Sequence, residues 1–515
     1  MGRKVLPTGT RLRELCLSMP NRSGELSWCL GIGIGMLATG LASAQGINIR
    51  PTLTVSTTYS DTRGQVLAEA DRQFVTQISP GFSWVSRQGR IQGSADYTLN
   101  ARFYSKQDEA DSRQNALAAS LKVEAIEDWF FVDGRASVAQ EAISPFGQPV
   151  SGSFAVNDNA TEVRTYSLSP YVRGSAFGSS VYEARWTTTQ TRGSRAVESN
   201  SSSDTSLVSL SSASAARIGW SVLASRQKVD FGSGANSAND RVNAQVSMAV
   251  DPALRLGLTG GRESTDVVGG IRRSYDNWGW TLRWTPSPRT ELSVLSERRY
   301  FGNSHNFSFS HRMRRSNWVY NDTRGTNSGS SAVGTGQPVS LYSLYFNLFA
   351  AQEPDPTLRD QLVRSFLLSI GQDPAALVAG GFLSSGVTLQ RRQDLAVAVQ
   401  GVRTSISLQA FRGDTRQLQT TGSTLGALPI QQSGFVASAS YRLTPTSSVS
   451  LTGSLQRTAS NGIEPESDTR SASLSWSATL GRHVGATVAL RHTDFESSSN
   501  PYRESAATAS LNVRF

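Results

Sequence analysis

The feature that most constrains this chain is its last stretch, in which apolar and polar side chains alternate strictly. Reading back from Phe515, apolar residues recur at Val513, Leu511, Ala509 and Ala507, with polar residues between them. Such a stretch forms a β-strand with one apolar and one polar face. It is typical of the final strand of a transmembrane β-barrel. Taken alone, the stretch leaves one alternative open, an edge strand of a soluble β-sandwich.

The same alternation recurs along the chain from Ile49 onward, and this recurrence favours a barrel. In the clearest example, Ile91 to Phe103, thirteen residues alternate without a break, whereas strands of globular proteins are usually about five to six residues long. We therefore predict an all-β fold, a large antiparallel transmembrane β-barrel of about 20–22 strands with one short helical insertion.

The connections between the predicted strands are short and long by turns. Short ones such as Asp251-Pro252 and Thr444-Pro445 contain proline, which suits a tight reversal because its φ is fixed and it has no amide donor. Long ones such as 60–71 and 461–470 are polar and charged. In an outer-membrane barrel the short connections are periplasmic and the long ones extracellular.

Composition agrees with a barrel whose lumen is wet. Only 38% of the residues are hydrophobic, too few for a helical membrane protein but enough for a band of alternate residues. The net charge is +10, and all but four of the 50 basic residues are arginine. Arginine binds carboxylate and phosphate in a planar fork, so this surface suits anionic sugars or lipid phosphates. A genomic base composition that favours arginine codons is the simpler explanation.

Residues 1–44 are typical of an export signal. Basic residues precede an uncharged run, 26–41, and Ala42-Ser43-Ala44 before Gln45 matches a signal-peptidase site. We predict a signal peptide at 1–44, a barrel at 45–515 and localisation to the bacterial outer membrane. A permanent anchor is the alternative, and translation starts at Met1 or Met19. Both cysteines lie in this segment, so the mature chain has no disulfide or thiolate site.

Residues 317–386 depart from the strand pattern, and we predict a loop and helix insertion within the barrel. Leu358, Leu362, Phe366 and Ile370 recur at helical spacing behind Pro356. The helix fits a lumenal plug, a periplasmic bracket or a lipid-facing element.

Counting strands gives about fourteen before this insertion and about seven after it, while a barrel with both chain ends in the periplasm needs an even total. We therefore expect one extra strand inside 317–394, which we place within 382–392, with the helix on the periplasmic side.

Several local sequences are similar to one known family. They are the opening Ile49-Arg-Pro-Thr-Leu, the strand Ser169-Pro-Tyr-Val-Arg-Gly174, Arg299-Tyr-Phe-Gly-Asn-Ser304 leading into Phe309-Ser-His-Arg312, and Leu389-Gln-Arg-Arg392 after the helical insertion. Together they resemble the outer-membrane proteins associated with the PEP-CTERM/exosortase system. The resemblance implies a β-barrel that accompanies exosortase and exopolysaccharide gene clusters. That family has no established activity, so no catalytic residues carry over.

The sequence gives no sign of an enzyme. The four histidines, His305, His311, His483 and His492, lack metal-ligand spacing such as H-E-x-x-H. The glycine-rich pieces lack the strand-loop-helix context of a nucleotide site. We accordingly predict no catalytic residues, no cofactor and no metal, and no binding of nucleic acid.

Charged residues between outward apolar positions should face the lumen. Two interpretations stay open for them: arginine and carboxylate pairs that hold the interior together, or a positively biased conduit for acidic saccharides. The candidate lumen charges are Arg102, Arg185, Arg255, Arg283, Asp96 and Glu183.

These observations lead to one functional hypothesis and two alternatives. The chain would be accessory to surface export in the exopolysaccharide/exosortase (PEP-CTERM) system, or else a diffusion porin, or else a structural barrel with a blocked lumen. We expect a monomer whose partners are outer-membrane lipid and lipopolysaccharide, anionic exopolysaccharide, and the barrel-assembly machinery. That machinery would recognise Phe515, Val513 and Leu511 at the C-terminus, as the general resemblance to outer-membrane barrels implies.

Overall fold

The computed structural model describes most of the chain after the predicted signal peptide. The described residues are 48–515, apart from 65–70, 87–88, 106–110, 151–156, 196, 213–216, 330–344, 347–348, 350–358, 360–362, 364–380, 419–428, 461–465 and 498–500. The predicted signal peptide and the predicted helix residues Leu358, Leu362, Phe366 and Ile370 therefore lie outside the described part.

The described part is built almost entirely of β-strands. Their bounds are β1 (Asn48–Gly64), β2 (Asp71–Ser86), β3 (Ile91–Tyr104), β4 (Ser112–Ile126), β5 (Phe130–Ala142), β6 (Ala160–Ala176), β7 (Ser180–Gly193), β8 (Ser201–Ser212), β9 (Ile218–Phe231), β10 (Asn236–Asp251), β11 (Leu254–Thr265), β12 (Arg273–Ser287), β13 (Thr290–Arg299), β14 (Gly302–Arg312), β15 (Ser316–Asn327), β16 (Thr388–Gln400), β17 (Thr404–Gln417), β18 (Ile430–Thr444), β19 (Ser447–Ser460), β20 (Ser467–Thr479), β21 (Val484–Ser497) and β22 (Tyr502–Arg514). A short 3-10 helix, η1 (Val197–Ser199), precedes β8.

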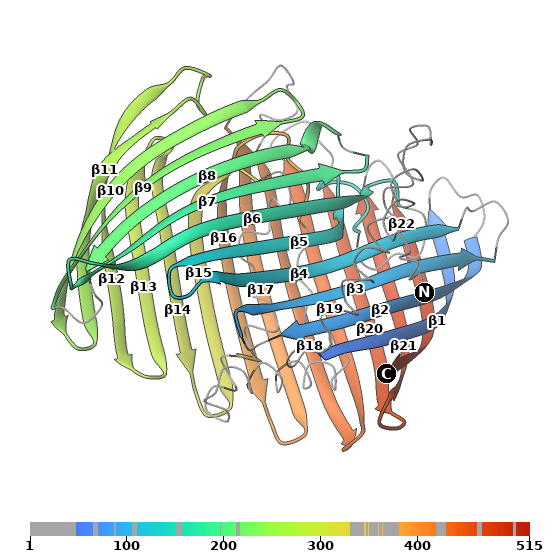
Figure 1. The fold of residues 1–515 in the computed structure, drawn as a ribbon. Coiled ribbons are helices and arrows are strands. Elements are labelled where there is room, and N and C mark those ends of the chain that lie inside the picture. Colours follow the sequence, from blue (N-terminus) through green and yellow to red (C-terminus); the bar gives the residue numbers. More distant parts are fainter. Residues whose placement is uncertain are drawn as a thin grey trace, which may run out of the picture. The chain divides into compact units, whose positions relative to one another are not determined.

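The strands form one closed antiparallel barrel of 22 strands (Figure 1). Each strand pairs with its neighbours in sequence, and the first pairs with the last, so that Val55 lies opposite Leu511 and Leu53 opposite Val513. Beyond this register, the amide of Phe515 donates to the carbonyl of Pro51 at 3.0 Å. The predicted barrel is confirmed, and the sandwich alternative is excluded because no strand of the wall is left as an edge.

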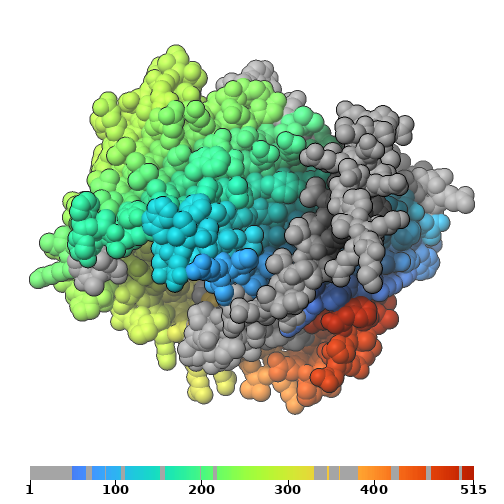
Figure 2. All heavy atoms as spheres, in the orientation of Figure 1, coloured from blue at the N-terminus to red at the C-terminus, as the bar shows by residue number. Residues whose placement is uncertain are grey.

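The two faces of the wall differ in polarity, as alternation requires. Leu474, Leu490 and Leu511 all project from the outer face and are about half exposed. Aromatic side chains are exposed near the strand ends, among them Trp129, Trp284, Trp318, Tyr441 and Trp476. Figure 2 shows side chains of neighbouring strands filling the spaces between the ribbons. An apolar outer band with aromatic borders is the arrangement of a barrel that spans a membrane.

The barrel has two unlike ends. At the turn end, which holds both β1's start and β22's finish, neighbouring strands are joined by short connections such as 252–253 and 445–446. At the loop end, the connections are longer, such as 143–159 and 328–387. Odd-numbered strands therefore run from the turn end to the loop end.

The placement of the insertion corrects three predictions. Residues 316–327 form β15, so the departure from the barrel begins at 328 and not at 317. The extra strand that the even count required is this β15; within 382–392, only 388–392 is strand, and it begins β16. Because Asn327 pairs with Thr388 at the loop end, the insertion leaves the wall there and not on the periplasmic side.

A described stretch before β16, residues 381–387, crosses the loop end and is named the strap here. Phe382 pairs with Ala142 at the end of β5, and the amide of Leu383 donates to the Ala142 carbonyl at 3.0 Å. Ten of the 22 strands lie between β5 and β16 in either direction around the wall. The strap therefore bridges opposite sides of the loop-end opening.

Polar and apolar contacts anchor the strap to the β9–β10 connection. The Ser233 hydroxyl donates to the carbonyl of Ser385 at 2.8 Å. Val387 belongs to a buried cluster whose other members are Val229, Phe231, Ala235 and Val267. Burial of this cluster holds the strap against the inner side of the wall.

The lipid-facing role of the outer band can be tested at Leu490, which lies on β21 between Leu474 and Ala507. Replacing Leu490 by Arg places a charge in the apolar band and should lower the free energy of unfolding by about 2–4 kcal/mol. Urea unfolding in phospholipid vesicles measures the loss. The control Leu490→Phe, which stays apolar, should unfold near the wild-type midpoint; equal destabilisation by both variants would contradict the assigned face.

Candidate functional site on the inner wall

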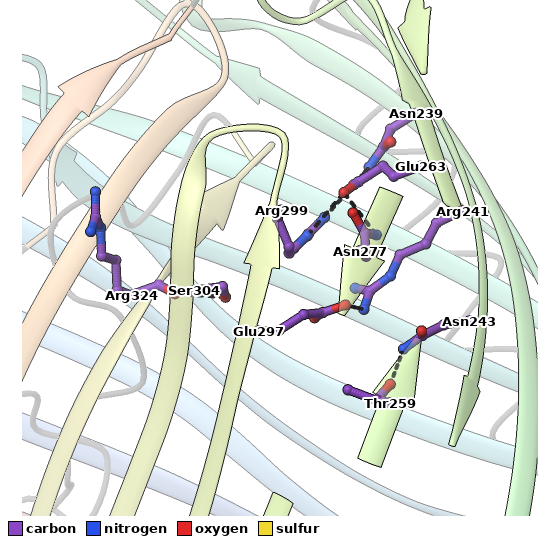
Figure 3. A network of polar contacts seen from close by, with 10 residues as sticks. All are labelled: Asn239, Arg241, Asn243, Thr259, Glu263, Asn277, Glu297, Arg299, Ser304 and Arg324. Atoms are coloured by element: carbon purple, nitrogen blue, oxygen red, sulfur yellow. Dashed lines mark hydrogen bonds and ion pairs between the residues drawn. The ribbon is translucent and has the colours of Figure 1, made fainter. Parts of the chain in front are cut away.

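The inner wall near the loop end carries buried carboxylates that are fully paired. Glu263 on β11 has no exposed surface, and both of its carboxylate oxygens contact Arg299 on β13 (Figure 3). The Asn239 amide also donates to Glu263 Oε1 at 2.9 Å, and that of Asn277 donates to Oε2 at 3.4 Å. A buried charge with this many partners is electrostatically compensated.

The same wall repeats this arrangement one layer nearer the turn end. Glu297 is almost fully buried and accepts a hydrogen bond from the Arg241 guanidinium at 2.5 Å. In Figure 3 the Glu297–Arg241 pair lies below the Glu263–Arg299 pair, and Asn243 and Thr259 are bonded below both at 2.8 Å. Strands β10 to β13 thus place these buried charges in contact with opposite charges.

Two further ion pairs at the loop end also contain buried charges. On β22 the Glu504 carboxylate accepts from the Ser60 hydroxyl at 2.9 Å and lies 3.4 Å from the Arg491 guanidinium. On β16 the Arg392 guanidinium lies 2.9 Å from the Asp394 carboxylate. The described inner wall at the loop end is therefore an array of ion pairs, and its cations are largely neutralised.

Near the turn end, cations on strands β4 to β7 are held in a different way. Phe131 and Tyr171 are buried on the inner face and stack with ring centroids 5.1 Å apart. Lys122 lies over the Phe131 ring at 5.4 Å, and Arg173 lies over the same ring at 4.3 Å. Arg185 lies over the Tyr171 ring at 3.7 Å. These five residues are named the turn-end cluster.

Within the turn-end cluster, only Arg185 is held by carboxylates. Its guanidinium donates to Glu183 at 2.8 Å and to Asp133 at 3.0 Å. Lys122 and Arg173 make no ion pair with any other described residue; the contacts found for them are those with the aromatic ring. A ring attracts a cation through its quadrupole without cancelling its charge. The cluster therefore presents two cations whose donors are not occupied by a carboxylate, although Asp133 lies opposite Lys122 and Glu183 opposite Arg173 in the strand register.

The candidate lumen charges predicted from the sequence fall on the inner face but do not form one site. Arg185 and Glu183 meet in the turn-end cluster, while Arg283 pairs with Glu291 at 3.0 Å on the neighbouring strand β13. Arg102 donates to Gln77 Oε1 at 3.0 Å. Arg255 lies 3.4 Å from the Ser247 hydroxyl, and Asp96 lies on the inner face of β3.

Sequence reasoning missed the aromatic part of the turn-end cluster. Phe130, Phe131 and Val132 form an unbroken apolar run, so alternation alone does not say that Phe131 faces inward. The useful signal was cross-strand register, because Phe131 lies opposite Tyr171, and Tyr171 opposite Arg185. Register of this kind depends on how several strands pair, so it cannot be predicted from the sequence of any one segment.

Besides the strap, Tyr345 of the insertion also contacts the inner wall. Tyr345 is almost fully buried, packs against Phe349 with ring centroids 6.1 Å apart and shares a hydrogen bond with Ser407 on β17. Burial raises the pKa of the Tyr345 phenol to about 12, and the bond with Ser407 opposes this rise. Because Ser407 is a buried inner-face residue, Tyr345 lies inside the barrel.

The wall that Tyr345 touches is lined by small hydroxyl side chains. Serines on neighbouring strands bond in pairs across β17 to β20: Ser407 with Ser438 at 3.0 Å, Ser448 with Ser477 at 2.9 Å, Ser450 with Ser475 at 2.7 Å and Ser454 with Ser471 at 2.7 Å. Small side chains leave space in the lumen, and their mutual bonds satisfy the hydroxyls without water.

Comparison with known proteins adds only fold-level similarity. No protein-family model and no curated protein matches the sequence. Among solved structures, the FrpB iron transporter from Neisseria meningitidis matches with a TM-score of 0.47 and 9% identity, over 93% of this chain and 84% of that one. The siderophore receptor PirA from Acinetobacter baumannii matches with a TM-score of 0.46 and 9% identity, over 92% and 81%. OccK11 (OpdR) from Pseudomonas aeruginosa has a TM-score of 0.30 and 9% identity, over 91% and 96%.

Two kinds of feature are absent from the part of the chain that the structure describes. No helix there is long and apolar enough to cross a bilayer. Over the same residues, no group of three or more His, Cys, Asp or Glu side chains could hold a metal ion.

The compensated loop-end wall makes a prediction about stability. Glu263→Ala leaves the Arg299 guanidinium buried without its carboxylate, which should cost about 3–5 kcal/mol. Glu263→Leu combined with Arg299→Leu removes both charges and should recover most of that loss. Asp276→Ala, which breaks only a solvent-exposed pair with Arg262, serves as the control, and the urea midpoint in vesicles is the readout. A double variant as unstable as Glu263→Ala would argue against this pairing.

Proposed function

We propose that this chain is a non-enzymatic β-barrel of the bacterial outer membrane that assists the passage of an anionic surface polymer. The placement in the membrane is supported by the apolar outer face and by the closed antiparallel wall. The link to exopolysaccharide and exosortase (PEP-CTERM) systems is supported by the sequence resemblance at 49–53, 169–174, 299–312 and 389–392.

One observation carries the proposal, the unequal distribution of charge between the two ends. In the described connections of the turn end, seven arginines stand against two carboxylates, Glu127 and Asp128. The arginines are Arg90, Arg217, Arg289, Arg314, Arg315, Arg403 and Arg482. A rim of one sign focuses the field at the opening and raises the local concentration of the opposite charge. An anionic chain in the periplasm would be attracted to this end.

We propose two further partners for the outer surface. Beyond the apolar band toward the loop end, the outer face carries arginines such as Arg298, Arg412 and Arg470, which suit the phosphates of lipopolysaccharide. At the closing strand, the outward positions Leu511 and Val513 and the terminal Phe515 remain the proposed signal for the barrel-assembly machinery. Phe515 is largely exposed, which leaves it accessible for recognition.

A structural barrel with a blocked lumen is the second candidate, and specific contacts favour it. The strap bridges opposite sides of the loop-end opening through Leu383 and Ala142, and Tyr345 lies inside the barrel against Ser407. A diffusion porin, the third candidate, would need these elements to leave an open path. Conductance separates an open path from a blocked one.

The basic turn end predicts anion selectivity. For the mature chain in a planar bilayer under a KCl gradient, the reversal potential should have the sign of a chloride-selective pore, because the lumen concentrates anions. Raising the ionic strength should weaken the preference, since screening shortens the range of the field. Cation selectivity under the same gradient would contradict a positively biased lumen.

The insertion can be removed without breaking the strand pairing of the wall, because Asn327 and Thr388 are a register pair of adjacent strands. Replacing 328–387 by a short Gly-Asn-Gly turn should leave a folded barrel and increase single-channel conductance several-fold, as a lumenal obstruction is lost. The wild-type chain is the reference for conductance. A change in electrophoretic mobility when the sample is heated shows that the variant was folded before heating. Unchanged conductance in a folded variant would mean that this segment does not obstruct the lumen.

The proposed role in secretion of an anionic polymer is tested in the cell that produces this protein. Deleting the gene should reduce secreted acidic polymer and leave bulk outer-membrane permeability to small solutes unchanged. A chromosomal copy of the wild-type gene is the control for restoration. Normal secretion with reduced uptake of small solutes would instead favour the porin.

A further inference from the structure

We propose that the turn-end cluster is a binding site for the carboxylate of an acidic sugar residue, held by the Lys122 ammonium and the Arg173 guanidinium. This inference rests on the proposed function and deepens it, because it assigns the substrate class, a uronate-type saccharide, to defined side chains. Its support is the way in which these two cations are held and the direction in which they face.

Both cations are positioned without an ion pair to any described residue. They share one support, the buried ring of Phe131, which lies 5.4 Å from the Lys122 nitrogen and 4.3 Å from the Arg173 guanidinium carbon. The inner wall near the loop end holds its arginines with carboxylates instead, as Glu263 holds Arg299. A carboxylate occupies the donors of an arginine, whereas a ring leaves them free for a ligand.

The other cluster residues and two carboxylates form a packed base beneath these cations. Phe131 stacks on Tyr171, and Arg185 covers the far ring at 3.7 Å while both Glu183 and Asp133 accept its hydrogen bonds. With two carboxylates against one guanidinium, this base attracts Lys122 and Arg173 toward the wall. The base therefore limits their conformational freedom, which lowers the entropy lost when an anion binds.

The site opens toward the lumen. Arg173 is exposed and Lys122 is half-buried, and both project from the same face as the inner-wall residues Ser120 and Ser169. Four residues further along β5 from Phe131, about 13 Å toward the loop end, the exposed Arg135 also faces the lumen. Arg135 makes no ion pair with the described residues. A polymer with a carboxylate on its repeating unit could contact the cluster and Arg135 together.

The test uses a matched pair of arginines. Arg173 and Arg442 are both exposed inner-face residues at the turn end, and among described residues neither forms an ion pair, but only Arg173 lies over a ring. Fluorescently labelled trigalacturonate is titrated onto the full mature chain in detergent at fixed salt, and fluorescence anisotropy gives Kd. Arg173→Gln should raise Kd about tenfold, the loss expected for one charge-assisted interaction, and Arg442→Gln should change it less than twofold.

Two further arms identify what is bound. Lys122→Gln should weaken binding in the same direction as Arg173→Gln, and the fully methyl-esterified trisaccharide, which has no charge, should not bind. Equal weakening by Arg173→Gln and Arg442→Gln would overturn the site in favour of diffuse attraction, as would absence of saturable binding to the wild type. Those results leave the secretion experiment untouched, so failure of the site and failure of the proposed function are distinguishable.

Discussion

The pairing of β1 with β22 is the interaction on which the rest of the molecule depends. In a bilayer no water is present to bond an unpaired amide or carbonyl, so a sheet with free edges cannot persist there. The closing register runs from Thr52 opposite Arg514 to Gly64 opposite Tyr502, which satisfies both edges at once. Closure determines the surroundings of each strand side chain, because one face of the wall then contacts lipid and the other faces the lumen.

Closure also directs charged side chains into the barrel, where the inner wall must compensate their charge. A wall of 22 strands directs every second side chain inward, and charges there lose part of their hydration wherever neighbouring side chains cover them. Glu263 and Glu504 have no exposed surface. Their buried carboxylates are stabilised by arginine and by neutral hydrogen-bond donors around them. Ion pairing is therefore a structural requirement at the covered loop end, and it leaves few charges for a ligand.

The sequence predicted strand positions well where the strands cross lipid. It predicted them poorly where the strands extend beyond the apolar band. Ile91 to Phe103 matches β3 to within one residue, because lipid demands an apolar outer face. By contrast, β15 escaped detection because Asp322 and Arg324 occupy outer-face positions after Trp318 and Tyr320. Outside the apolar band, polar side chains are tolerated on both faces of a strand. Apolar and polar residues therefore no longer alternate in the sequence, although the backbone hydrogen bonds between the strands continue. Strand-count parity recovered the number of strands but could not locate the missing one.

The site shows the same limit at the level of single residues. Alternation could place Arg185 and Glu183 on the inner face, but the neighbours of Lys122 and Arg173 depend on register across four strands. That register brings one ring beneath two cations, an arrangement that has a clear electrostatic consequence. Exchanging a carboxylate partner for an aromatic one keeps a cation in place and preserves its charge. A barrel can thus hold neutralised arginines at one end and available ones at the other with the same residue type, and the difference lies in the partner.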